Sequence, residues 1–157
     1  MIKTKRLYTS LLLIISVLLT HSLVTHIFQD SCFILKNISK GLPFSYFVGY
    51  SSQELERGNY MSFDHPKSET LIIKIVAGLP GDHISFKNDK IYINGYACGE
   101  VKKISPSGMS LNPISEGIIP DGYVFMQGLH PDSFDSRYHE FGLVAISQLK
   151  ARLWPLF

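Results

Sequence analysis

The sequence predicts a mainly β fold that follows one apolar helix at the N-terminus. Three observations lead to this expectation. Residues 7–29 contain no Asp, Glu, Lys or Arg. Over the rest of the 157-residue chain, short runs of β-branched and aromatic residues alternate with turns that contain Gly or Pro. No long amphipathic helix pattern follows the apolar run. Many short strands with such turns favour an antiparallel barrel or folded sheet.

The N-terminal apolar run is long enough for a membrane helix, because roughly 20 apolar residues span a bilayer. Lys3, Lys5 and Arg6 precede it, and basic residues favour the cytoplasmic side. We therefore expect a cytoplasmic stub and anchor over 1–29 in the inner membrane, and a periplasmic β domain over 30–157. The alternative is a cleaved secretory signal. The length of the run and the lack of a following A-x-A site favour the anchor.

The β domain is expected to be a single small domain, with strands separated by polar turns. The strongest pattern is "TLIIKIVAGL", which ends at the turn "PGD", and "HISFKNDKIYING" indicates two strands around "KNDK". "SPSGMSLNPISEG" indicates a long polar insertion. The expected strand-forming segments and the closing segment are 44–50, 60–63, 70–79, 83–95, 123–128 and 142–156.

Charge and metal-ligand patterns narrow the function classes. The net charge of +2 comes without a basic stripe, so we expect no nucleic-acid partner. Cys32 and Cys98 are too few for a structural zinc site; a disulfide and two free thiols both remain open. His130 and His139 lie near Asp132, but their spacing matches no metal motif. We expect neither a metal nor a cofactor.

Lys74 stands out because it interrupts the apolar run "LIIKIVAGL". Burial disfavours the charged ammonium and lowers a lysine pKa. A neutral lysine near pH 7 can act as a general base toward a serine hydroxyl. The alternative is a lysine that faces solvent from an edge strand.

Two segments carry a resemblance to a known family. The run from Lys74 to Asp82, K-x-V-x-G-L-P-G-D, resembles the segment of type I signal peptidases that holds the general base. "SFDSRY" at 133–138 resembles their last conserved segment, most of all in TraF-type conjugative-transfer peptidases. The resemblance implies the folded antiparallel sheet of signal peptidases and a serine–lysine dyad. It also implies that the partners are an exported pilin precursor, the lipid bilayer and other transfer-apparatus proteins.

The same resemblance implies roles for four residues. Lys74 matches the general base, and Ser133 matches the serine that orients it. Asp135 and Arg137 match an ion pair that braces the site, and the aspartate is linked to activity in TraF-type enzymes. The alternative for Asp135 and Arg137 is a surface pair of little energetic value.

The nucleophile segment departs from the family pattern. Asn37, Pro43 and Phe47 match the pattern N-x-[S/T]-x-S-x-P-x-G-x-[Y/F], but Gly41 occupies the position of the nucleophilic serine. Ser39 matches the hydroxyl that helps stabilise the oxyanion.

Three interpretations follow from Gly41. Ser39 or Ser45 acts as the nucleophile after a local register shift, or the chain is a pseudoenzyme that binds peptide by β-augmentation. The third is an alignment displaced by two residues. We predict an active serine endopeptidase in which Ser39, Lys74 and Asp135 are catalytic, and which processes or cyclises a pilin. The alternative is an inactive binding component of the transfer apparatus.

Overall fold

The structure is a computed structural model. It describes residues 2–29, 32–37, 41–50, 54–65, 68 and 70–156, and within the N-terminal helix it describes the side chains of residue 8 and residues 12–26. The chain forms two units, Met1–Phe33 and Ile34–Phe157. Each unit is described separately.

The first unit is dominated by α1, Ile2–Gln29. The single helix predicted for this part of the chain is therefore present. Among the residues that the structure describes, no helix is both long and apolar enough to cross a membrane. The membrane anchor stays a prediction.

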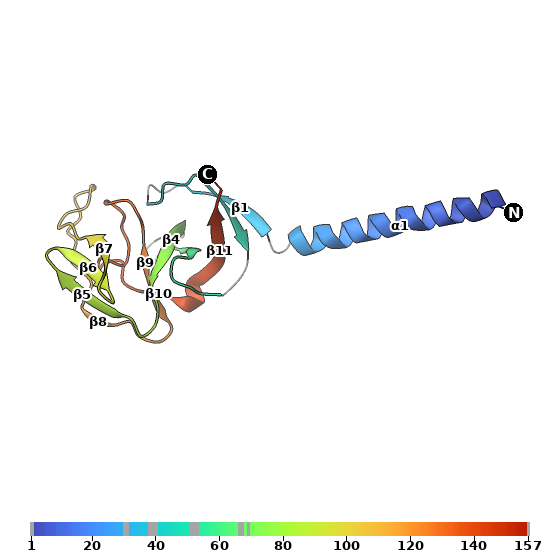
Figure 1. Cartoon of the computed structure of the whole chain (residues 1–157). Coiled ribbons are helices and arrows are strands. Elements are labelled where there is room, and N and C mark those ends of the chain that lie inside the picture. Colours follow the sequence, from blue (N-terminus) through green and yellow to red (C-terminus); the bar gives the residue numbers. More distant parts are fainter. Residues whose placement is uncertain are drawn as a thin grey trace. The chain divides into compact units, whose positions relative to one another are not determined.

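The regular structure of the second unit is antiparallel β-sheet apart from one 3₁₀ turn, and this confirms the predicted mainly β class (Figure 1). A seven-stranded sheet has the order β1-β2-β11-β3-β4-β9-β10, and a four-stranded sheet has the order β7-β6-β5-β8. The elements are β1 Cys32–Lys36, β2 Tyr46–Tyr50, β3 Tyr60–Asp64, β4 Leu71–Gly78, β5 His83–Lys87, β6 Lys90–Ile93, β7 Tyr96–Glu100, β8 Gly117–Ile118, β9 Tyr123–Gln127, β10 Val144–Ala145, the 3₁₀ turn Ile146–Gln148 and β11 Leu149–Pro155.

β4 is an interior strand of the larger sheet and lies between β3 and β9. Its near-continuous apolar sequence suits a strand that is covered on both faces. Ile72 and Val76 belong to one apolar core and Ile73 to another, as the alternation of side chains along a strand requires. β3 pairs with β4 from Leu71 onward, whereas β9 pairs with β4 only from Ile75 onward. Among the described strands, the first half of β4 therefore pairs with β3 alone, and its other side has no partner strand.

The smaller sheet is built on the predicted hairpin of β5 and β6. Ile84 pairs with Ile93, and Lys87 pairs with Lys90 across the turn. The two turn residues, Asn88 and Asp89, have positive φ angles of 52° and 57°. This conformation gives a two-residue turn whose twist matches the flanking strands, and Asn and Asp tolerate it better than most residues.

The two cysteines lie in different environments and are not joined. Cys98 is buried in the core of the smaller sheet, while Cys32 is exposed, and both are free thiols. Burial is the main cause that raises the pKa of the Cys98 thiol to about 11. Of the two alternatives left open by the sequence, the structure has the free thiols.

Candidate active site

Lys74 lies on β4 and faces the larger apolar core. It pairs across the sheet with Met61 on β3, and alternation along the strand puts it on the same face as Ile72 and Val76. Only 5% of its surface is exposed. The alternative of a solvent-facing edge lysine does not fit this position.

The amine of Lys74 makes a hydrogen bond with Ser133. Nζ donates to the Ser133 Oγ at 2.5 Å, and the two residues are 59 positions apart in the sequence. Burial is the largest influence on the pKa of Lys74 and holds it below the ordinary value of 10.5. The charge of Arg137 lowers this pKa further, while the charge of Asp135 opposes the shift. A lowered pKa gives the amine the lone pair that a general base needs.

The position of Ser133 depends on the loop that follows β9. The Ser133 N–H donates to the carbonyl of His130 at 2.9 Å, which closes a turn. Gly128, at the end of β9, leaves room for this serine: a Cβ there would overlap the Ser133 hydroxyl and lie 3.1 Å from Lys74 Nζ. A side chain at 128 would therefore push the lysine and the serine apart.

Asp135 and Arg137 form a buried ion pair behind the lysine. Arg137 Nε and Nη2 donate to the two carboxylate oxygens at 2.8 and 3.0 Å, and the two side chains are 0% and 3% exposed. Asp135 also accepts from the Gly128 N–H at 2.8 Å, and Arg137 donates to the carbonyls of Ser133 and Glu100. Burial acts to lower the pKa of Arg137, but its hydrogen bonds to Asp135 raise it above the ordinary value.

This geometry rules out the alternative of a weak surface pair for Asp135 and Arg137. A buried pair is costly to desolvate, and losing either partner would leave an uncompensated charge. Here the pair also fixes the main chain at Gly128 and Ser133, the two positions that border Lys74. The predicted bracing role for these residues has a direct physical basis.

The segment that carries the nucleophile pattern reaches the same cavity as the lysine, through Gly41. Asn37 Nδ2 donates to the carbonyls of Phe44 and Leu42 at 2.9 and 3.4 Å, and its N–H donates to the Ser45 carbonyl at 2.8 Å. Phe47 is fully buried, in the same core as Leu42. Two positions that matched the pattern, Asn37 and Phe47, therefore hold this segment in place.

Gly41 is buried and lines the cavity that contains Lys74. Its carbonyl accepts from the N–H groups of Leu129 and His130 at 2.8 and 3.1 Å. The predicted nucleophile Ser39 lies outside the described residues, within 38–40. Ser45 is exposed and is not among the described residues that line the cavity.

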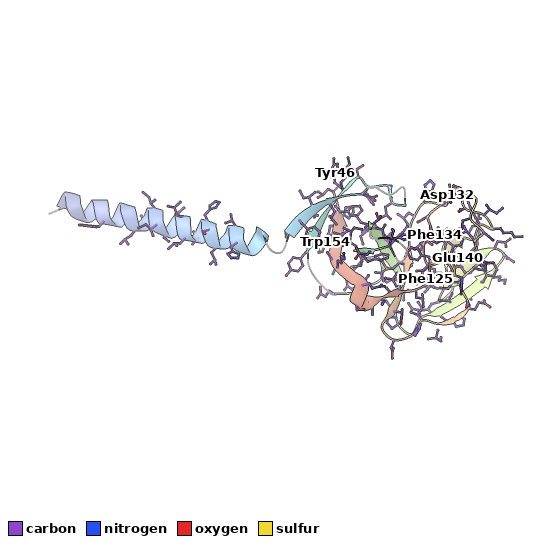
Figure 2. The ribbon with its side chains drawn as sticks, turned by 180° about the vertical axis from the view of Figure 1, so that it is seen from behind. Tyr46, Phe125, Asp132, Phe134, Glu140 and Trp154 are labelled. Atoms are coloured by element: carbon purple, nitrogen blue, oxygen red, sulfur yellow. The ribbon has the colours of Figure 1, made fainter. Side chains whose placement is uncertain are left out.

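The cavity has a volume of about 480 Å³. In Figure 2, the lining residues Asp132 and Phe134 are labelled to the right of Tyr46 and Trp154 in the β unit. Lys74 and Ser133 contribute polar atoms to its wall, and Ile72 and Phe134 contribute apolar surface. The lining residues are Gly41, His65, Ile72, Lys74, Pro106, His130, Asp132, Ser133 and Phe134.

The lining residues that sequence reasoning missed include His65, Pro106 and Phe134. The His65 ring stacks on Phe134 with centroids 6.0 Å apart and meets Phe141 edge-on at 5.7 Å. Pro106 belongs to the polar insertion that the sequence marked without a function. No spacing rule connects these positions, because the three segments meet only in the folded chain.

The metal alternative gains no support from the geometry. His130 and Asp132 line the cavity, and the Asp132 N–H donates to His130 Nδ1 at 3.1 Å. Within the described ranges, no three His, Cys, Asp or Glu side chains are grouped as a metal ion requires.

The arrangement can accept a proton from a hydroxyl placed beside Lys74. The amine is desolvated, its direction is fixed by Ser133, and the ion pair holds the surrounding main chain. Fixing a general base in this way is how a serine hydroxyl is activated for acyl transfer.

Comparison with known proteins identifies the family. Residues 6–155 match the family "Signal peptidase, peptidase S26". The chain belongs to this signal peptidase family. The predicted resemblance is thereby confirmed at the level of the family.

Three relatives illustrate the match. Signal peptidase IB of Staphylococcus aureus (strain COL) is 30% identical over 133 residues, which cover 69% of this chain and 65% of that protein. Conjugal transfer protein TraF of Agrobacterium fabrum (strain C58 / ATCC 33970) is 32% identical over 88 residues, covering 55% of this chain and 48% of TraF. The crystal structure of a signal peptidase I from Enterococcus faecalis V583 aligns with a TM-score of 0.45 and 25% identity, over 64% of this chain and 97% of the other. The chain thus spans about two thirds of the length of the Staphylococcus aureus protein and about half of the length of TraF.

Proposed function

We propose that the chain is a membrane-anchored, signal-peptidase-like protein that processes an exported precursor, a conjugative pilin. One observation carries this proposal. The buried Lys74 amine, hydrogen-bonded to Ser133 at 2.5 Å, opens into a cavity of about 480 Å³ that Gly41 also lines. A general base on one wall and the family's nucleophile segment on the other are the two parts that serine–lysine chemistry brings together.

An extended peptide has a place to bind beside this cavity. A smaller cavity of about 150 Å³ is lined by Leu35 and Lys36 of β1, by Asn37, and by Leu71 and Ile73 of β4. β9 pairs with β4 only from Ile75 onward, so on that side of β4 the half with Leu71 and Ile73 has no partner among the described strands. A peptide strand that paired with the free edge of β4 would carry its carbonyl groups toward Lys74, which follows Ile73 directly. Such strand addition supplies affinity through main-chain hydrogen bonds.

The reaction we propose is acyl transfer. The hydroxyl of Ser39 attacks the scissile carbonyl carbon, and its proton passes to Lys74. The amine of the leaving segment departs with a proton, and an ester joins the precursor to the serine. Water then hydrolyses the ester, or an amine of the same precursor attacks it and yields a cyclic product.

The pilin and the membrane are proposals of the same kind. The likeness to a conjugal transfer protein supports a pilin substrate. The uncharged residues 7–29, preceded by three basic residues, support an inner-membrane anchor with a cytoplasmic N-terminus and a periplasmic β domain. Separation of membranes from soluble fractions tests this placement, and a chain without residues 1–29 should lose membrane association.

A second function is favoured by Gly41. A glycine lines the cavity where the family pattern has its serine, and glycine has no side chain that can attack a carbonyl. The alternative is a binding component of the transfer apparatus that holds a precursor along β4 without cutting it. In this case Lys74 would bind substrate carbonyls as a hydrogen-bond donor.

Mass spectrometry of a co-expressed candidate pilin precursor distinguishes the two functions. The informative variants are Lys74→Met, Ser39→Ala, Ser45→Ala and Gly41→Ser, and Lys87→Met at an exposed turn is the matched lysine control. Loss of the processed product in Lys74→Met and Ser39→Ala, but not in the control, is the expected result. Processing that survives Lys74→Met would contradict serine–lysine chemistry in this chain.

Two further outcomes separate activity from binding. An unprocessed precursor that co-purifies with every variant favours the binding component. A product that forms only in Gly41→Ser shows that the cavity is competent and lacks only the hydroxyl. Because the neutral amine is the active form, any processing rate should rise with pH through the lowered pKa of Lys74.

A further inference from the structure

We propose that the polar insertion forms a second subsite, which takes one large apolar side chain from the precursor segment that follows the scissile bond. This inference rests on the proposed function, because it needs a peptide across the Lys74 cavity. It gives a role to residues 104–110, which the chemistry at Lys74 does not use.

The insertion forms an ordered hairpin. Ile104 and Ser110 form an antiparallel bridge, and the Ser105 N–H donates to the Met109 carbonyl at 2.8 Å. The Ser105 hydroxyl accepts from the Met109 N–H at 2.9 Å, and the Gly108 N–H donates to the Ser105 carbonyl at 2.9 Å. These hydrogen bonds hold the conformation of the hairpin tip, so this polar segment can form a defined wall of a cavity.

Behind the hairpin lies a cavity of about 270 Å³. Its apolar wall consists of Met109, Leu111, Phe134 and Tyr138, of which Leu111 and Tyr138 are 7% and 1% exposed. Ligand pockets commonly measure about 300–1,000 Å³, so this cavity lies just below that range and has room for one large side chain. An apolar interior with few polar groups selects an apolar occupant, because a charge placed there would lose its hydration.

An ion pair holds the two sides of this cavity together. Lys102 Nζ pairs with Asp132 at the rim, and the Lys102 N–H donates to the Tyr138 hydroxyl at 3.3 Å. Lys102 precedes the hairpin, whereas Asp132 belongs to the loop that carries Ser133. The subsite is therefore tied to the loop that positions the lysine of the main site.

This cavity adjoins the Lys74 cavity. Both are lined by Pro106, Asp132 and Phe134. The groove at the edge of β4 has different walls, which include Leu71 and Ile73. In the proposed complex, the peptide residues before the scissile bond pair with β4. The residues after that bond are then the ones that reach the hairpin. The occupant is thus a side chain of the leaving segment.

The test uses the full chain and synthetic peptides of about twelve residues that carry an Ala-x-Ala site. Leu, Ala or Asp is placed at the first, second or third position after the site. Fluorescence anisotropy gives the dissociation constants. At one of these positions, Leu should bind roughly 10-fold or more tightly than Ala or Asp, as expected for filling an apolar pocket.

Two variants and one spectroscopic signal locate the contact. Met109→Glu should abolish the preference for Leu, whereas Ile104→Glu should keep it, because Ile104 is 64% exposed in the same hairpin and does not line the cavity. Equal melting temperatures show that both variants are folded. The Met109 methyl resonance should shift with the Leu peptide, while that of Met126, buried in the core, should not.

The outcomes separate this inference from the proposed function. Peptides that bind or are cut with no preference among Leu, Ala and Asp overturn the subsite only, as does a preference that survives in Met109→Glu. Phosphatidylcholine vesicles that shift the Met109 methyl resonance without peptide would show that a lipid chain is the occupant, and would also overturn it. No binding and no cleavage of any peptide by the wild type overturns both proposals.

Discussion

The two walls of the Lys74 cavity are built in different ways. The base wall is formed by Lys74 and Ser133, with the ion pair of Asp135 and Arg137 behind them, and hydrogen bonds join these buried residues. The arm wall is the segment of residues 37 and 41–47, of which Gly41 lines the cavity. This segment is held by one asparagine side chain and the buried residues Leu42 and Phe47.

Of the two walls, only the base wall has a structure that indicates a chemical function. A sheet of this kind does not need a buried lysine and a buried ion pair, and apolar residues of similar volume would often be as stable. The base wall therefore points to a reaction or to recognition of a polar substrate group. The arm wall needs only main-chain geometry at Gly41, so its structure is equally compatible with cutting and with holding a peptide.

The largest change in stability is expected when Arg137 is replaced. Arg137→Met should lower the free energy of unfolding by about 3–5 kcal/mol, because the buried carboxylate of Asp135 loses its partner. Urea unfolding measures the change. Arg152→Met is the matched control, since Arg152 pairs with exposed Glu54 and Glu56, and it should cost less than about 1 kcal/mol. If the two variants lost the same free energy of unfolding, the buried ion pair of the base wall would contribute no more than an exposed one, which would contradict this prediction.

A second, smaller effect is expected at Gly128. Gly128→Ala should cost about 1–3 kcal/mol, because the added methyl group overlaps the Ser133 hydroxyl. The double variant Gly128→Ala with Ser133→Gly removes the overlap. Unfolding experiments on the single and double variants should therefore show coupling. Strictly additive losses would mean that the two positions do not meet as described.

On the arm wall, Asn37→Ala should cost about 1 kcal/mol, the net value of a typical hydrogen bond. The bonds lost are those from Nδ2 to the carbonyls of Leu42 and Phe44. The midpoint of urea unfolding measures this loss. Limited proteolysis between 37 and 47 should become faster, while the base wall keeps its protection from hydrogen exchange. Loss of protection at Ser133 and Gly128 in this variant would show that the two walls are one cooperative unit.

The smallest expected effect is the dependence of stability on the protonation of Lys74. Burial holds the pKa of Lys74 below 10.5 in the folded chain, and Asp135 partly opposes this. Between the lowered pKa and 10.5, the unfolded chain binds a proton that the folded chain does not. The free energy of unfolding of the wild type should therefore rise with pH relative to that of Lys74→Met, up to about pH 10.5. Urea unfolding over a pH series checks the sign, and a constant difference would contradict the lowered pKa.

Much of the candidate site was predictable from short segments of sequence. The segment 133–138 and the order Asn37, Gly41, Phe47 indicated the two walls only through the resemblance to signal peptidases. The lysine in an apolar strand and the turn after it are local patterns, because strand alternation and turn chemistry depend on neighbouring residues. The hairpin turn at Asn88 and Asp89 was predictable for the same reason.

The sequence alone was enough to predict the mainly β class, the place of several strands along the chain, and the lysine that interrupts the most apolar strand. The order of the strands in the two sheets came only from the folded chain. So did the contact between Lys74 and Ser133, the place of Gly41 in their cavity, and the contribution of His65 and the 104–110 hairpin to the walls. The reason is physical. A cavity is the space left where side chains from distant segments pack against one another, and no rule of spacing along the chain fixes that packing.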